Sequence, residues 1–257
     1  MVLYTTIHLH NVSPGREGDF AHWFDGPHRA DLVRLRGFRS ADRFEVTPEQ
    51  VMPDIPQPWR FLSVYEFDLA APEIDLPALG PLLAGPRDAG LTDDASESER
   101  IYSYAMYSDW KFSPNHRPDK PFSGVSIIIG NFTAGREAEY HKWYDEVHAP
   151  EVTGVPGKVA MKRGRLASLQ IEPRRYCPGG ELVYCAQQTN NLAFTIQDFI
   201  DRARGNSPSG VVFQPRSKAG SLARTVHYFR KISGTEFWDG GIAYDGDLSV
   251  YGALAKG

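Results

Sequence analysis

The sequence predicts an α+β fold built from two copies of one β-α-β-β-α-β unit. The first observation is a repeat: Asn11–His28 matches Asn131–His148, with Asn, Gly, Arg, Glu, Trp, Asp and His in register. The second is that the expected elements follow the same order in both halves. The third is the composition, with 41% hydrophobic and 23% charged residues, which is typical of a globular protein long enough for two ordinary domains. Matched Trp, Asp and His at fixed spacing therefore indicate an internal duplication.

Each half opens with a strand that is followed by a helix. Side chains alternate over Tyr4–His10, and Val125–Ile129 is an apolar run, so both segments are expected to be strands. Ser13 and Thr133 then stand where a helix N-cap is expected. The two helices carry an aromatic stripe on one face, made by Phe20, Trp23 and Phe24 in the first copy and by Tyr140, Trp143 and Tyr144 in the second.

The remaining elements complete the unit. Further strands are expected over Phe38–Val46, Trp59–Phe67, Ile101–Ser108, Lys158–Ala167, Glu181–Gln188 and Arg224–Lys231, and helices over Ile74–Leu83 and Leu192–Arg204. This is the order of tandem ferredoxin-like repeats, whose antiparallel sheets carry both helices on one face and can meet face to face as an α+β barrel. The repeats are expected at 1–112 and 123–231, and the C-terminal tail at 232–257 belongs to neither.

The repeated motifs resemble those of a known family. A strand, Gly-Arg-Glu, then Trp-Phe-Asp-x-x-His (Trp23–His28) or Trp-Tyr-Asp-x-x-His-Ala-Pro (Trp143–Pro150), then Pro-Gly, resembles the EthD-like branch of the dimeric α+β-barrel superfamily, with two copies fused in one chain. The resemblance covers residues 3–46 and 124–166. It implies a barrel of two sheets, with a ligand cavity between sheet and helices or inside the barrel. Relatives include cofactor-free cyclases, lactone isomerases, polyketide dehydratases, quinone-forming monooxygenases and haem enzymes, so the resemblance implies no single chemistry.

The repeated histidines are the first catalytic candidates. On a helix, Asp145 and His148 are three residues apart and can meet on one face, as can Asp25 and His28. A carboxylate that orients an imidazole makes a general acid or base near neutral pH. The alternative is a structural hydrogen bond that closes the helix end. His148 is the stronger candidate because Gly26 and Pro27 change the approach to His28.

His8 and His10 alternate with aliphatic residues in the first strand. If the aliphatic side chains face the helices, both histidines and Tyr4 face the barrel interior, where one of them would serve as the opposing acid or base. The second copy has Ile128 and Gly130 at these positions, which argues against a purely structural role. His-x-His is also a metal-binding pair, but spacing fixes no third ligand, so a polar pocket wall is favoured and no metal is expected.

Aromatic residues are the expected walls of a small-molecule site. Trp23 and Trp143 are first of all core residues, but the motif places them, with Tyr144, close to the histidines. Tyr102 and Tyr104 alternate on one face of a closing strand and predict a cavity suited to a flat apolar or phenolic ligand. The alternative for the strand tyrosines is an ordinary sheet core.

Several protein classes are disfavoured. The net charge of −4 comes without the basic stripe of nucleic-acid-binding proteins or a polybasic membrane patch. Nucleotide-binding loops and the serine-hydrolase elbow are also missing from the sequence. The start of the chain lacks a signal-peptide pattern and no apolar run reaches the length of a bilayer span, so a cytoplasmic protein is expected. Cys177 and Cys185 are expected to be free thiols.

These features predict a cofactor-independent lyase or isomerase that acts on a small aromatic or apolar molecule through histidine acid–base chemistry. The second hypothesis is a cofactor-free or haem-dependent monooxygenase, in which His148, His227 or His141 could supply an axial ligand. The third is a non-catalytic binder of an apolar small molecule. A homodimer stays open, because sheet edges and the tail could pair with a second copy.

Overall fold

The computed structural model describes residues 2–92, 99–171 and 177–234. In that part of the chain nine strands form one antiparallel sheet, and eight of them close into a barrel. The first half contributes β1 (Val2–His10), β2 (Phe38–Val46), β3 (Phe61–Leu69) and β4 (Arg100–Met106). The second half contributes β6 (Gly124–Gly130), β7 (Lys158–Leu166), β8 (Glu181–Gln187) and β9 (Thr225–Gly234). The short strand β5 (Lys111–Phe112) pairs with β7.

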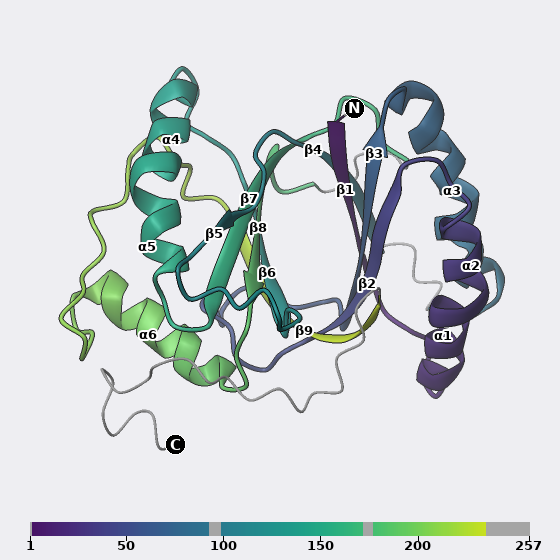
Figure 1. Ribbon diagram of the computed structural model, residues 1–257, viewed down its shortest axis with the longest axis horizontal. Helices are drawn as coiled ribbons and strands as arrows, with labels where there is room; N and C mark the ends of the chain where they lie inside the picture. Colours follow the sequence, from purple (N-terminus) through teal and green to yellow (C-terminus); the bar gives the residue numbers. More distant parts are fainter. Residues whose placement is uncertain (1, 93–98, 172–176, 235–257) are drawn as a thin grey trace.

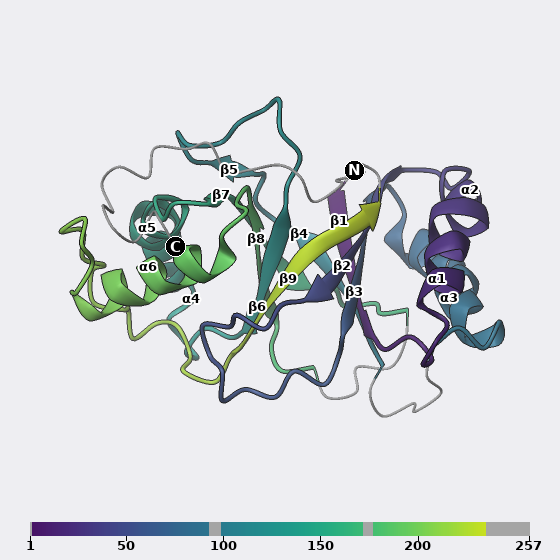
Figure 2. The ribbon, with the colours of Figure 1, turned by 90° about the horizontal axis from the view of Figure 1, so that it is seen from below.

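The two halves have corresponding strand orders, β4-β1-β3-β2 and β9-β6-β8-β7. β2 pairs with β9, and β4 pairs with β7, so the two sheets are joined along both edges. Figure 2 shows β9, in yellow, running between β2 and β6. The α+β class, the antiparallel sheets and the barrel predicted from the sequence are confirmed.

Helices cover the outside of the barrel in two layers, one from each half (Figure 1). In the first half, α1 (Glu17–Trp23), the π-helical turn η1 (Phe24–His28) and α2 (Arg29–Leu32) follow one another beside α3 (Pro72–Asp88). In the second half, α4 (Glu137–Trp143), the π-helical turn η2 (Tyr144–His148) and α5 (Ala149–Thr153) form one layer with α6 (Leu192–Arg204). Both repeated motifs therefore fold into a helix with a π-helical turn at the same place.

The first helix of each half starts later than its predicted N-cap. Ser13 and Thr133 are followed by turns in which Gly15 has φ = 79° and Gly135 has φ = 76°. These left-handed residues delay entry into α1 and α4 by a turn. The two hydroxyl groups donate instead to backbone carbonyls of neighbouring loops.

Two other segments differ from the expectation. α3 extends beyond the predicted Ile74–Leu83 and contains three internal prolines. Its buried leucines on the sheet side offset the backbone donors that proline removes. β9 continues to Gly234, so the first residues of the predicted tail at 232–257 belong to the barrel. The rest of that tail lies outside the described residues.

Side chains from both halves, most of them apolar, fill the barrel. Ile7 of β1 and Ile127 of β6 belong to one cluster and are fully buried. Tyr102 and Tyr104 of β4 lie in the same cluster and are 2% and 0% exposed. An eight-stranded barrel has an interior about wide enough for its own side chains. The tyrosines therefore occupy the core, in keeping with the alternative that the sequence left open.

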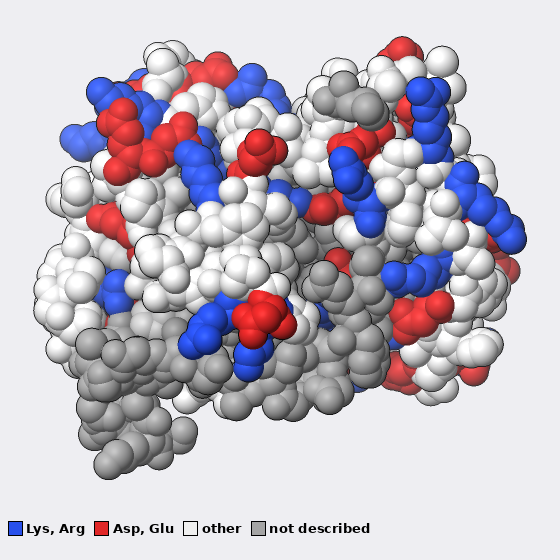
Figure 3. Space-filling model, viewed as in Figure 1, with Lys and Arg blue, Asp and Glu red and all other residues white. Residues whose placement is uncertain are grey.

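The surface carries both signs of charge. On the face in Figure 3, Lys and Arg side chains are interspersed with Asp and Glu. Of the helices in the described ranges, none combines the length and the hydropathy needed to cross a bilayer. Cys177 is partly buried and Cys185 is buried, and both thiols are free, as the sequence predicts.

Gly157 provides a test of the packing between α6 and the turn before β7. It has φ = 85°, and a Cβ there would lie 2.5 Å from Oγ1 of Thr195 and 2.8 Å from Cβ of Thr189. Gly157→Ala is expected to lower the free energy of unfolding by about 2–4 kcal/mol, because left-handed strain adds to a steric clash. Gly210→Ala is the control, since φ is 72° there and the space is open. Urea unfolding measures both, and equal losses would contradict the clash.

Candidate active site in the second half

His148 is the last residue of η2 and its ring is held by two aromatic side chains. It stacks on Trp143 with ring centroids 4.4 Å apart and planes at 14°, and it meets Tyr144 edge-on at 5.1 Å. The histidine side chain is 23% exposed. Single π-helical turns are often found at functional sites. The turn and the two rings together give the imidazole a fixed orientation.

The predicted pairing of Asp145 with His148 is wrong. Asp145 accepts hydrogen bonds from Nη2 of Arg163 at 2.6 Å and from Nζ of Lys111 at 2.5 Å. Nδ1 of His148 lies 3.8 Å from Oε2 of Glu151 instead. The π-helical turn causes this, because residues three apart no longer lie one above the other as in an α-helix. Glu151, one turn later, is the carboxylate that faces the imidazole.

The first half repeats this arrangement and needs the same correction. Asp25 accepts a hydrogen bond from Nη2 of Arg43 at 3.2 Å. The buried His28 stacks on Trp23 with ring centroids 4.1 Å apart, and its Nε2 lies 3.2 Å from the hydroxyl of Tyr65. The Asp–Arg pair is thus a feature that ties each helix to the strand beneath it. Sequence reasoning missed both arginines, although their matching positions in β2 and β7 were visible in the repeat.

The predicted orientation of His8, His10 and Tyr4 is also wrong. The aliphatic residues between them fill the barrel, so these three side chains face the helices of the first half. Nε2 of His8 lies 2.6 Å from Oε1 of Glu99, and Nε2 of His10 lies 3.1 Å from the hydroxyl of Ser63. Both histidines are 1% exposed. They occupy the layer on the far side of the barrel from the second-half helices and do not oppose the second-copy histidine.

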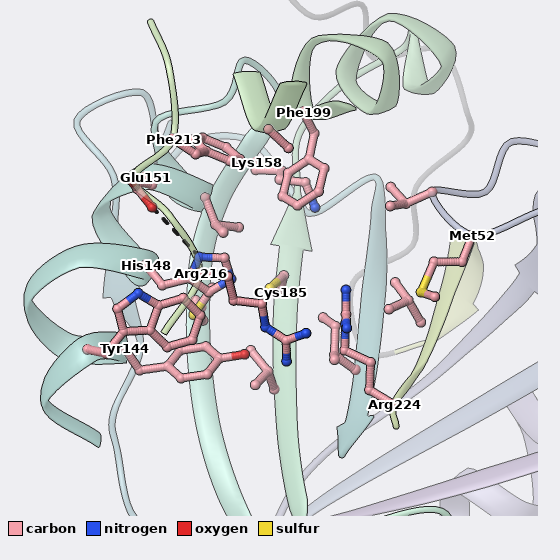
Figure 4. A pocket seen from close by; sticks show the side chains of 18 of the residues that line it. Met52, Tyr144, His148, Glu151, Lys158, Cys185, Phe199, Phe213, Arg216 and Arg224 are labelled. Carbon is pink, nitrogen blue, oxygen red and sulfur yellow. Dashed lines mark ion pairs between the residues drawn. The ribbon is translucent and has the colours of Figure 1, made fainter. Parts of the chain in front are cut away.

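A cavity of about 220 Å³ lies between the sheet and the helices of the second half (Figure 4). His148, Trp143 and Tyr144 form part of its wall, and Phe199 of α6 covers it. An apolar cavity of about 150 Å³ is large enough to bind benzene, so this one suits a molecule of one or two rings. Two of the predicted binding residues therefore line a cavity.

A difference between the halves explains why the cavity is in the second. Tyr65 in β3 pairs with Ala41, and at the matching register Cys185 in β8 pairs with Met161. The ring of Tyr65 is buried against the first-half helix and its hydroxyl reaches His28. Cys185 is much shorter and lines the cavity. The smaller side chain leaves open the space that a tyrosine ring takes in the first copy.

The electrostatics of the cavity favour a neutral imidazole. Burial lowers the pKa of His148 below its usual range, Glu151 opposes this shift, and the charges of Arg216 and Lys158 add to it. A neutral histidine can accept a proton at physiological pH. Sequence reasoning missed Glu151 and these cations. The available signal was Lys158, which stands where the first copy has Phe38.

The described residues contain no group of three His, Cys, Asp or Glu side chains placed to hold a metal ion. His227, one of the predicted axial-ligand candidates, faces the barrel interior with Nδ1 2.5 Å from Oε1 of Gln57. His141 lies 3.4 Å from guanidinium nitrogens of Arg163 and Arg165. Of the three candidates, only His148 lines the cavity.

Comparison with known proteins identifies the fold. No protein-family model matches the chain, and no curated protein matches it. A proposed monooxygenase from Fusobacterium nucleatum subsp. nucleatum is similar in structure, with a TM-score of 0.52 and 8% identity over 91% of this chain and 94% of that one. An anthrone oxidase-like protein has a TM-score of 0.54 and 10% identity, over 91% and 92%. A proposed monooxygenase from Lactobacillus acidophilus has a TM-score of 0.53 and 6% identity, over 91% and 96%.

At such low identity the likeness concerns the fold alone. The chain shares the fold of these proteins, and in it one chain supplies both sheets of an α+β barrel.

Buried histidines are expected to make stability depend on pH. Burial lowers the pKa of His28 to about 3 and that of His227 to about 4. An unfolded histidine titrates near 6.5, so between pH 6.5 and about 4 the unfolded state binds more protons and stability falls as the pH falls. For His28 the loss between pH 7.5 and 5.0 is expected to be on the order of 2 kcal/mol. Urea unfolding at the two pH values measures it.

The His28→Gln variant is the control, because glutamine does not titrate. Its free energy of unfolding should depend less on pH than that of the wild type. Identical pH dependences would contradict the lowered pKa of His28.

Proposed function

We propose that the protein is an enzyme that binds a small aromatic molecule in the second-half cavity, and that His148 acts there as a general base. The observation that carries this proposal is the fixed imidazole of His148 at the wall of a mostly apolar cavity. An apolar cavity with a few convergent polar groups is the usual form of a small-molecule site. A lowered pKa in such a cavity is typical of catalytic groups.

Glu151 has the position of a partner for this base. It lies next to Nδ1 of His148, and its other oxygen accepts a hydrogen bond from the backbone N–H of Gln214 at 2.6 Å. The carboxylate is therefore held in place and stabilises the imidazolium that forms when the ring accepts a proton. This role is the one that the sequence assigned to Asp145.

The reaction that follows proton removal defines the enzyme class. A lyase or isomerase completes an elimination or a ring rearrangement and needs only positioned acid–base groups in a cavity that excludes water. A cofactor-free monooxygenase starts with the same proton removal, and the resulting anion then reacts with molecular oxygen. We favour the lyase or isomerase, and the monooxygenase is the second candidate because the same base and cavity serve both.

Haem fits this cavity poorly. The volume of about 220 Å³ suits one or two rings, whereas haem is a macrocycle several times larger than benzene. His148 also stacks on Trp143 and has Glu151 beside Nδ1, an arrangement that suits proton transfer. We therefore propose chemistry without haem, and an absorbance spectrum of the purified protein with no Soret band is the expected result.

We also infer that each half is one ferredoxin-like unit of the EthD-like type, with the units spanning 1–112 and 123–231. Support comes from the corresponding strand orders and from the π-helical turn that both copies of the Trp-x-Asp-x-x-His motif form. The first unit has kept the scaffold, and the second is the one that carries the site.

The base is tested by replacing His148 with glutamine. The wild type is incubated with a panel of one- and two-ring phenols, enolisable ketones and lactones, and products, oxygen uptake and exchange of substrate C–H for deuterium are followed. His148→Gln is expected to lower the rate about 10²–10⁴-fold, the usual contribution of a general base. Oxygen uptake separates the monooxygenase from the lyase or isomerase.

His8→Gln is the matched control. His8 lies in the first-half layer, so its replacement is expected to leave the rate per folded molecule unchanged. A His148→Gln variant that is folded and as active as the wild type would overturn the proposed base. Saturable binding with no product from any compound would favour the non-catalytic binder.

A further inference from the structure

Lys158 is a buried cation at the wall of the cavity. Its side chain is 2% exposed, and Nζ donates a hydrogen bond to the hydroxyl of Tyr228 at 2.7 Å. The ammonium also lies over the rings of Tyr228, at 4.6 Å, and Phe199, at 5.1 Å. These contacts satisfy part of its hydrogen-bonding capacity, but among the residues that the structure describes no carboxylate pairs with its charge. A buried charge of this kind is costly unless an anion pairs with it.

Two arginines bring further positive charge to the same cavity. Arg216 and Arg224 belong to the loop between α6 and β9, and Figure 4 shows both side chains reaching into the cavity. The Arg216 guanidinium donates a hydrogen bond to the backbone oxygen of Ser221 at 2.5 Å. The Arg224 guanidinium donates one to the backbone oxygen of Leu222 at 3.3 Å. Burial and the charge of Arg224 lower the pKa of Arg216, so the two like charges lie close enough to interact.

The protein supplies little negative charge to balance them. Within the described ranges, no carboxylate forms an ion pair with Lys158, Arg216 or Arg224. Of the described residues that line the cavity, Glu151 is the acidic one, and it is engaged by His148 and by a backbone N–H. Three cations therefore face one carboxylate that already has partners.

The fold does not require a cation at this place. Lys158 is the first residue of β7, and the matching first residue of β2 is Phe38. The pairings with the next strand also match, Phe38 with Phe67 and Lys158 with Gln187. An apolar side chain thus completes the same barrel in the first half. The buried lysine is therefore explained by the cavity and its ligand, and not by the needs of the fold.

We propose that the ligand of this cavity is an aromatic carboxylate, whose carboxylate group binds to Lys158 and the two guanidinium groups. Planar carboxylates pair well with guanidinium donors, and hydrogen bonds between charged groups are the strong ones. The ring lies among Phe199, Met52 and Val226, which are apolar parts of the lining. This inference rests on the proposed function for the location of the site and names the substrate class.

Binding of matched probes tests the proposal without any turnover. We compare 2-naphthoate with its neutral amide, 2-naphthamide, and do the same for a panel of one- and two-ring acids and their amides, by calorimetry at pH 7.5. The acid is expected to bind at least about 10-fold more tightly, because a charged hydrogen bond contributes roughly 1.5–3 kcal/mol. NMR titration should show that the bound acid raises the pKa of His148, since it neutralises cations that lower it.

Charge-removing variants assign the effect to these residues. Lys158→Met, which keeps the length of the side chain, is expected to weaken binding of the acid about 10-fold and to leave the amide unchanged. Arg224 lies on a loop, so the Arg224→Gln variant gives the same comparison of acid with amide if Lys158→Met does not fold. Lys142→Met is the control, because that lysine is 71% exposed on α4 and away from the cavity.

The outcomes separate this inference from the proposed function. If no acid in the panel binds more tightly than its amide, or if the variants weaken both equally, the carboxylate proposal is overturned whatever His148→Gln does to turnover. If the preference for acids holds but His148→Gln remains active, the general base is overturned and the carboxylate site stands.

Discussion

Closure of the barrel is the constraint on which the rest of the structure depends. The β2–β9 and β4–β7 pairings join the two sheets along both edges. The strands approach closely enough at Gly164 that a Cβ there would lie 2.5 Å from Sδ of Met106. Side chains of both halves then fill an interior of this size. Space for a ligand is left on the outer side of the sheet, beneath the helices.

The two halves use that outer space differently. In the first half it holds His8, His10, His28 and Tyr65, and Nε2 of each histidine faces a polar side chain of the same half. In the second half Cys185 stands at the position of Tyr65, and the same layer contains a cavity. A filled layer buries more apolar and hydrogen-bonded surface and stabilises the fold. An open one gives up part of this stability, which is the usual cost of a functional site.

The sequence predicts the architecture well because strand and helix patterns are local and were present twice. Its errors come from properties that a pattern does not contain. The partner of Asp145 changed because a π-helical turn altered the spacing, and His8 faced the helices because the barrel took the aliphatic side chains. The cavity depends on the volume of Cys185 relative to Tyr65, and the position of each side chain beneath its helix is set by pairing between strands distant in the sequence. The differences between the repeats gave two indications of location, Gly26 and Pro27 favouring His148 of the second half and the His8–His10 pair favouring the first half.

In the proposed function, the histidine that acts as the base and the cations of the cavity are coupled. Burial lowers the pKa of His148 and the charges of Arg216 and Lys158 add to this shift, so the free protein holds a neutral but weakly basic imidazole. In the proposed complex an anion bound to these cations offsets their effect, so the pKa of His148 is expected to be higher than in the free protein. By linkage, the ligand that neutralises the cations also favours protonation of the base. A neutral aromatic molecule would fill the same volume but leave the base weak. The charges of the cavity would therefore favour an anionic ligand in two ways, through direct contact with its carboxylate and through the rise in the pKa of His148 that this ligand causes.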